Sequence, residues 1–80
     1  MLFSACTAPN EGYVAGDHDI GDLASTGWQD CAAKCGADPH CAAWTLLKEN
    51  NHCWLKTEGY TTGTSKDWLW GLPCRGIARS

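Results

Sequence analysis

Residues 28–55 read WQDCAAKCGADPHCAAWTLLKENNHCWL, and this stretch holds four of the six cysteines of the 80-residue chain. Its first part predicts a helix from about Thr26 to Cys35. An apolar stripe recurs there at helical spacing and is expected to be buried: Trp28, Cys31, Ala32 and Cys35. Ser25 or Thr26 is expected to cap the start of this helix, and Gly36 to end it.

The second part of the stretch predicts a β-hairpin. Strands are expected over Cys41–Leu47 and His52–Thr57, because they flank the turn-forming residues 49–51. Weaker strand signals lie at Tyr13–Ala15 and Trp68–Leu72, while residues 59–65 are typical of a surface loop. The expected fold class is therefore α+β, with one helix packed on an antiparallel sheet.

The composition indicates one small, exported domain. A chain of 80 residues buries only about 60% of the surface that its unfolded form exposes, so it usually needs crosslinks. Six cysteines, an even number, are typical of a disulfide scaffold made in an oxidising compartment. Since no signal peptide opens the sequence, we expect a module of a larger secreted or extracellular protein.

Charge and hydropathy argue against two kinds of partner. Six basic and nine acidic residues give a net charge of −3, so the chain lacks the basic stripe of a nucleic-acid binder. No run of about 18 apolar residues is present that could enter a membrane. Neither nucleic-acid binding nor membrane insertion is expected.

Six cysteines allow fifteen pairings, and helix geometry favours some of them. Cys31 and Cys35 lie on one face of the expected helix, so each should bond to a cysteine elsewhere. Cys35 can close a small loop to Cys41, and Cys31 can reach Cys53 at an inward-facing strand position. The first and the last cysteine would then join the two ends of the domain.

Zinc is the competing chemistry for the same cysteines. Thiolates and imidazoles together bind zinc, and His40 and His52 adjoin Cys41 and Cys53. However, no C-x2-C knuckle is present, and residues adjacent on a strand point to opposite faces of its sheet. We therefore expect disulfides, with no metal and no cofactor.

No catalytic apparatus is evident in the sequence, so an enzyme is not expected. Paired cysteines leave no thiol nucleophile, and no G-x-S-x-G elbow presents a serine. Recognition by a surface remains, and five tryptophans are suited both to core packing and to contact with a ligand. Trp68 and Trp70 should share one strand face, whereas Asp17, Asp19 and Asp22 are typical of solvated turn carboxylates.

The order of the cysteines carries a family resemblance. A C-x3-C pair on the helix, Cys31 and Cys35, is followed by Cys41-Ala-Ala-Trp44 and then by Cys53-Trp-Leu-Lys56. This order resembles the PAN/apple domain, in which a helix with C-x3-C precedes C-x2-[FW] and C-[YWF]-[LI]-K. The match runs from about Cys6 to Cys74, and the Gly-, Ala- and Trp-rich sequence resembles the tandem apple modules of apicomplexan microneme adhesins.

The resemblance implies a five-stranded antiparallel sheet with one helix, stapled by Cys6–Cys74, Cys31–Cys53 and Cys35–Cys41. It implies a PAN/apple domain over residues 6–74, with residues 1–5 and 75–80 as flexible ends or linker. Some microneme apple domains are similar to galactose-binding lectins that use a lysine, a tyrosine and an acidic residue beside the sheet. Here the corresponding candidates for ligand binding are Lys56, Tyr60 and Asp17.

The resemblance further implies a non-catalytic extracellular adhesion module that binds protein, carbohydrate or both. In a multi-apple microneme protein it would serve host-cell attachment and invasion. Its partner would be a host-cell surface protein or glycan, or another secreted adhesin. The alternative is an assembly or exosite module in a secreted complex or a serine-protease zymogen.

Overall fold

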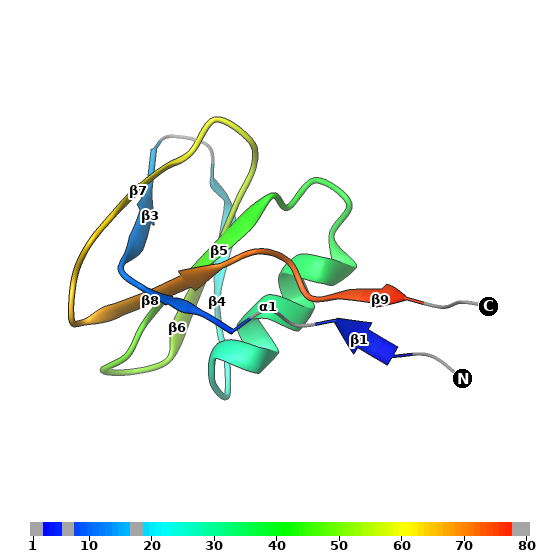
Figure 1. The fold of residues 1–80 in the computed structure, drawn as a ribbon, viewed down its shortest axis with the longest axis horizontal. Coiled ribbons are helices and arrows are strands. Elements are labelled where there is room, and N and C mark those ends of the chain that lie inside the picture. The colour runs from blue at the N-terminus through cyan, green and yellow to red at the C-terminus, as the bar shows by residue number, and fades with distance from the viewer. Residues whose placement is uncertain (1–2, 6–7, 17–18, 78–80) are drawn as a thin grey trace.

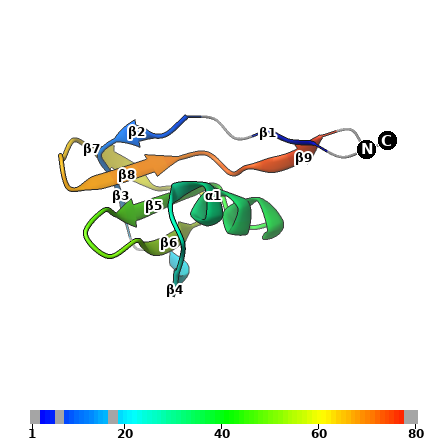
Figure 2. The same ribbon diagram turned by 90° about the horizontal axis from the view of Figure 1, so that it is seen from below.

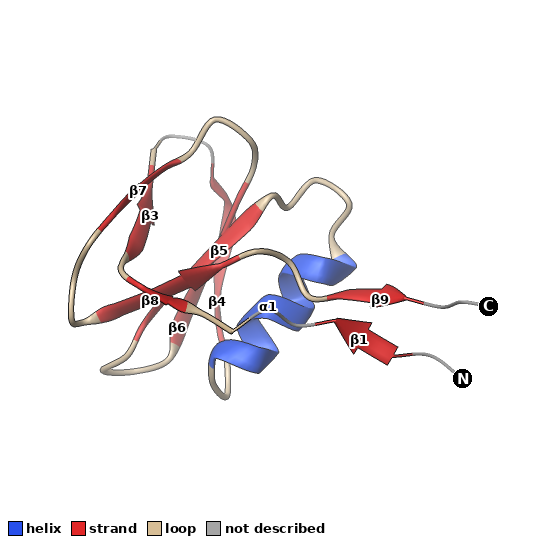
Figure 3. Ribbon diagram, in the orientation of Figure 1, coloured by secondary structure: helices blue, strands red, loops and turns tan. Residues whose placement is uncertain are grey.

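The computed structural model describes residues 3–5, 8–16 and 19–77. The elements follow one another along the chain in this order: β1 (Phe3–Ala5), β2 (Asn10–Glu11), β3 (Tyr13–Ala15), β4 (Asp19–Ala24), α1 (Trp28–Ala37), β5 (Ala43–Leu47), β6 (His52–Lys56), β7 (Thr61–Gly63), β8 (Trp68–Gly71) and β9 (Arg75–Ile77). Figure 3 separates the helix from the strands by colour. Among the residues described, α1 spans ten residues, and no helix there has the length and apolar character needed to cross a membrane.

The central sheet has five strands in the order β2-β8-β5-β6-β4, and every neighbouring pair is antiparallel (Figure 1). Its middle is the predicted hairpin, β5 and β6. One helix packs on this sheet, so the predicted α+β class and the five-stranded antiparallel sheet are confirmed.

The two faces of the sheet have different covers. Side chains alternate along a strand, and Cys53 of β6 is bonded to Cys31 of α1, so Cys53 and Leu55 face the helix. Trp54 and Lys56 therefore face the other way. On that side β3 and β7, which form a separate two-stranded ribbon, cover part of the sheet.

The core lies between α1 and the sheet, and it is built largely of cysteine and tryptophan. Its buried cluster comprises Cys31, Ala32, Cys35, Cys41, Trp44, Leu46, Cys53, Leu55 and Cys74. Trp44 has no exposed surface and stacks on Trp28 of the helix at a centroid distance of 6.2 Å. The predicted buried stripe of the helix is thus confirmed for Cys31, Ala32 and Cys35, and Trp28 is partly buried against the same core.

Between residues that the structure describes, two disulfides join parts of this core. Cys31–Cys53 ties the helix to β6, and Cys35–Cys41 closes the loop after the helix. These bonds use the four cysteines of the alternative zinc site. Cys6 of the expected Cys6–Cys74 bond lies outside the described residues.

The helix begins later than predicted and with a different cap. It starts at Trp28 after Gly27, whose φ of 153° favours glycine, so neither Ser25 nor Thr26 is the N-cap. The Ser25 hydroxyl instead donates to the carbonyl oxygen of Asn51 at 2.6 Å. Glycine replaces a side-chain cap here because the chain must turn sharply out of strand β4.

The helix also ends later than predicted, because Gly36 lies within its last turn. It continues to Ala37, and Asp38 adopts an extended conformation. Pro39 follows, and a residue before proline is disfavoured in the helical region. The helix is therefore ended by Pro39 and not, as was expected, by Gly36.

Strands β4 and β7 were not predicted. Asp19 and Asp22 were expected in a turn but belong to β4, an edge strand paired with β6. Its sequence, DIGDLA, lacks the strict apolar–polar alternation that reveals a half-buried strand, although residues 21–24 alternate between partly buried and exposed. Residues 61–63 form β7 within the expected loop.

The described parts of the two chain ends pair with each other. Phe3–Ala5 pairs with Arg75–Ile77 as an antiparallel ribbon, β1 with β9. This ribbon extends away from the sheet and helix in both views (Figures 1 and 2). Backbone pairing of the two segments satisfies amide and carbonyl groups that frayed ends would leave to water.

Candidate binding site

A cleft of about 350 Å³ lies on the face of the sheet opposite the helix. Strands β5, β6 and β8 form its floor and one wall, and β3 and β4 complete it. Its lining is Tyr13, Val14, Asp19, Thr45, Trp54, Lys56 and Trp68. The cleft therefore combines three aromatic side chains with one charged pair.

The aromatic wall consists of Trp54 and Trp68. Trp54 lies on β6 and Trp68 on β8, diagonally across the central strand β5. Their ring centroids are 5.2 Å apart with the planes tilted by 47°. Between them Thr45 is buried, and its hydroxyl donates to the carbonyl oxygen of Leu69 at 3.1 Å. The small threonine leaves the two indoles as a continuous apolar surface.

Tyr13 brings the third aromatic ring from the β3–β7 ribbon. It is paired with Gly63 of β7, and its ring lies so close that a Cβ on Gly63 would overlap it. The glycine therefore lets the ring lie across its neighbouring strand. Tyr13 is 37% exposed, so part of the residue is accessible to a ligand.

An ion pair between Lys56 and Asp19 forms the polar end of the cleft. Lys56 is only 7% exposed, whereas 48% of the Asp19 side chain is accessible. The ladder between β4 and β6 has a register shift between Asp19 and Gly21. Without this shift Ile20 would be the cross-strand partner of Lys56, because Gly21 is the partner of Leu55. The bulge thus places a carboxylate opposite the buried ammonium.

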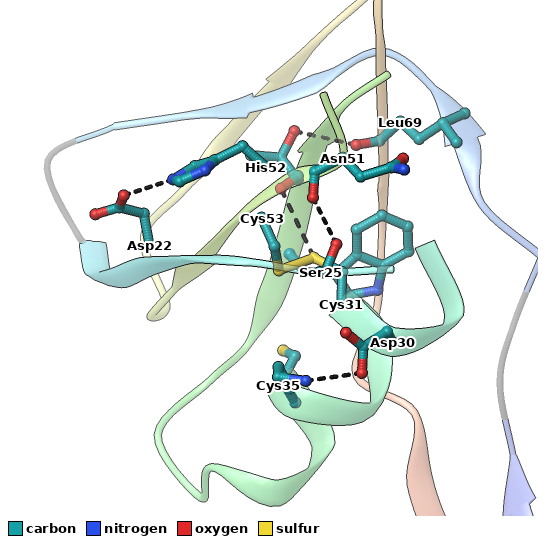
Figure 4. Close-up of a disulfide and its surroundings, with 12 residues drawn as sticks. Asp22, Ser25, Asp30, Cys31, Cys35, Asn51, His52, Cys53 and Leu69 are labelled. Atoms are coloured by element: carbon teal, nitrogen blue, oxygen red, sulfur yellow. Dashed lines mark hydrogen bonds and ion pairs between the residues drawn. A yellow bond between two sulfur atoms is a disulfide. The ribbon is translucent and has the colours of Figure 1, made fainter. Parts of the chain in front are cut away.

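A second pair from the same two strands lies at the other side of Trp54. His52 Nε2 is 2.6 Å from Asp22 Oδ2 (Figure 4). The His52 ring also contacts Trp54 at a centroid distance of 4.5 Å with an interplanar angle of 61°. Trp54 is therefore flanked along β6 by His52 and Lys56, each held by an aspartate of β4.

The sequence-based candidates are distributed unevenly around this cleft. Lys56 lies inside it. Tyr60 is partly buried in the loop between β6 and β7 and does not line the cleft, and Asp17 lies outside the described residues. The tyrosine and the carboxylate that stand with Lys56 are Tyr13 and Asp19.

Sequence reasoning missed four aromatic or charged residues of the cleft: Tyr13, Asp19, Trp54 and Trp68. The spacing of Trp54 and Lys56, two apart on a strand, was a usable signal, because it places both on one face. Asp19 gave no such signal. The position of Asp19 depends on the bulge at Ile20, and no pattern in the sequence predicts this bulge.

A second hollow, of about 570 Å³, lies beside the loop that follows the helix. Its lining includes Pro39, His40, Glu58 and Pro73, and it contains no tryptophan, tyrosine or phenylalanine. It is larger than the aromatic cleft, but more of its lining surface is polar than apolar. The aromatic cleft is therefore the stronger candidate, since ligand sites combine apolar walls with a few convergent polar groups.

Comparison with known families gives one match. The family model of the PAN domain matches residues 13–56, just over half of the chain. The matched region contains both described disulfides and, of the cleft, every lining residue except Trp68. Searches of curated proteins and of solved structures found no match.

Proposed function

This chain belongs to the PAN domain family, and we propose that it is a recognition module that binds a carbohydrate in the aromatic cleft. PAN domains are protein- or carbohydrate-binding modules of extracellular proteins and are typically non-catalytic. The observation that carries the proposal is one cleft in which an aromatic wall adjoins a lysine–aspartate pair.

The chemistry of a sugar ring matches these two features. A pyranose has a face of C–H groups, which packs on the electron-rich face of an indole, here Trp54 or Trp68. Its rim carries hydroxyl groups that both donate and accept hydrogen bonds. The Lys56 ammonium can only donate and the Asp19 carboxylate can only accept, so the pair matches two neighbouring hydroxyls.

The polar end is also organised before the ligand arrives. Lys56 is buried and its ammonium is already fixed by Asp19, so binding immobilises few additional side chains. The cleft volume of about 350 Å³ is near the lower end for small-molecule sites. Both properties favour a single terminal sugar of a longer glycan.

The ordered cysteines support a wider context for this activity. We infer a domain of residues 6–74 in a secreted multi-apple adhesin, as in the microneme proteins that it resembles. There it would contribute to host-cell attachment and invasion through a surface glycan. One shallow cleft gives weak affinity, and repeated modules raise the effective concentration of the next binding event.

A glycan array probed with the multivalently displayed chain tests the proposal, with Trp54→Ala and Lys56→Met as the informative variants. We expect wild-type signal for a restricted set of glycans and at least about a tenfold loss for each variant. Lys56→Met keeps the buried stem volume, and the exposed Asp19 stays solvated, so folding should persist.

Matched controls separate binding from folding. Trp70→Ala removes a tryptophan from the same sheet that does not line the cleft, and Lys48→Met removes a lysine paired with Glu11 elsewhere. Both should retain the glycan signal. Absence of signal from the wild type contradicts a carbohydrate ligand, and capture of a purified secreted adhesin or protease would then favour the assembly or exosite alternative.

A further inference from the structure

Asp22 and His52 do not line the cleft, yet they lie against its aromatic wall. We propose that they are positioning residues that fix Trp54 for the ligand, and that protonation of His52 strengthens ligand binding. The inference rests on the proposed function, because it concerns regulation of the same site.

The contacts form a chain from the sheet edge to the cleft. Asp22 is the direct cross-strand partner of Trp54, but its carboxylate is bonded to His52, 2.6 Å away. The imidazole in turn packs against the indole of Trp54, with their ring centroids 4.5 Å apart. Trp68 packs against the same indole, with a distance between centroids of 5.2 Å. Trp54 is thus held between two rings, and one of these is anchored by a carboxylate.

Asp22 supplies the charge in this arrangement. The cross-strand partners of His52 are Ala24 on β4 and Leu47 on β5. Both of these residues are uncharged. From the preceding turn, the side-chain oxygen of Asn50 accepts the backbone N–H of His52 at 3.0 Å. Among the described contacts of the ring, Asp22 is therefore the one that responds to its protonation.

The direction of the effect follows from that pairing. The hydrogen bond between a neutral imidazole and the Asp22 carboxylate is already charge-assisted, because its acceptor is ionised. Protonation of the imidazole adds the attraction between two opposite charges to this bond. The stronger bond restricts the imidazole and hence the indole beside it. Lowering the pH favours the imidazolium form of a histidine, so ligand affinity should rise as the pH falls.

NMR spectroscopy of the whole chain tests the positioning without any ligand. The indole N–H signal of Trp54, identified by its loss in Trp54→Phe, should move with pH and share its midpoint with the His52 ring signals. In His52→Gln the Trp54 signal should not respond to pH. In Glu11→Gln, which breaks an ion pair away from the cleft, the response should be unchanged.

Binding of methyl β-galactoside to the same proteins tests the regulation. Wild-type affinity should rise about threefold from pH 8 to pH 5, whereas His52→Gln should show a flat pH profile. Asp22→Asn should weaken binding without lowering the denaturation midpoint by more than Glu11→Gln does. Asp22→Glu, which keeps the carboxylate, should restore part of the affinity.

The two proposals fail in different ways. A Trp54 signal that ignores the ionisation of His52, or a His52→Gln variant with the wild-type pH profile, overturns the positioning proposal. A wild type that binds no sugar at any pH contradicts the carbohydrate function and the regulation of it. In that case the NMR experiment alone decides whether Asp22 and His52 position Trp54.

Discussion

At the scale of single residues, Gly71 shows how closely the core is packed. A Cβ on this residue would lie 2.8 Å from Cζ2 of the buried Trp44 ring. That ring cannot retreat easily, because it stacks on Trp28 and its N–H donates to the carbonyl oxygen of Leu72 at 2.9 Å. We expect Gly71→Ala to lower the free energy of unfolding by about 1–3 kcal/mol, measured by urea denaturation.

Gly21 provides the matched control, since it also lies in a strand of the central sheet. A Cβ on Gly21 would meet no atom within 4 Å. Gly21→Ala should change the free energy of unfolding by no more than about 0.5 kcal/mol. Equal losses in the two variants would mean that strand propensity, and not contact with Trp44, makes glycine necessary at position 71.

Residue roles could be predicted from the sequence where they depend on near neighbours. The buried stripe of the helix follows from a spacing of three and four residues, whereas Lys56 was named from the resemblance to the apple domain. Asp19 and Tyr13 could not be found in this way. Each reaches the cleft through a distant strand pairing, with Lys56 and with Gly63 respectively.

At the scale of elements, the start of the helix carries a test in Asp30. Hydrogen bonds from the Lys34 side chain, at 2.7 Å, and from the Thr26 backbone N–H, at 3.1 Å, lower the pKa of Asp30. Folding therefore favours the ionised carboxylate. This contribution is complete above the ordinary pKa, at about pH 4, and is lost as the pH falls through the lowered folded-state pKa.

Asp30→Asn measures that contribution. At pH 7 we expect a loss of about 0.5 kcal/mol in the free energy of unfolding, because water screens both exposed side chains. As the pH falls through the lowered folded-state pKa and the wild-type carboxyl becomes protonated, the difference should shrink to near zero. Lys34→Met should reproduce most of the loss at pH 7. A deficit in Asp30→Asn that persists unchanged in acid would contradict the electrostatic origin.

Elements were predictable in proportion to how much apolar surface they bury. The helix and the β5–β6 hairpin each bury a recognisable pattern. Strand β4 could not be predicted because both of its faces are at least partly accessible. Strand β7 could not be predicted because it consists of two threonines and a glycine that pair with β3 through the backbone. Yet β4 provides both aspartates that flank Trp54. The candidate site was therefore less predictable than the fold, since it depends on the elements with the weakest signals.

At the scale of the whole molecule, the two described disulfides constrain the chain to different extents. Cys31–Cys53 spans a sequence separation of 22 and joins the helix to the sheet, whereas Cys35–Cys41 spans 6 and stays within one loop. A crosslink stabilises largely by reducing the entropy of the unfolded chain, and the effect grows with loop length. The longer bond should therefore contribute more to stability.

Replacing both members of each pair by alanine tests this order. Loss of Cys31–Cys53 should lower the free energy of unfolding by about 3 kcal/mol, and loss of Cys35–Cys41 by about 2 kcal/mol. All four sulfur sites are buried to nearly the same degree, so the cavities left by alanine should be similar and the difference should reflect loop closure. Urea denaturation under non-reducing conditions gives both values. An equal or reversed order would show that local packing around the loop after the helix, and not loop entropy, determines how these bonds stabilise the domain.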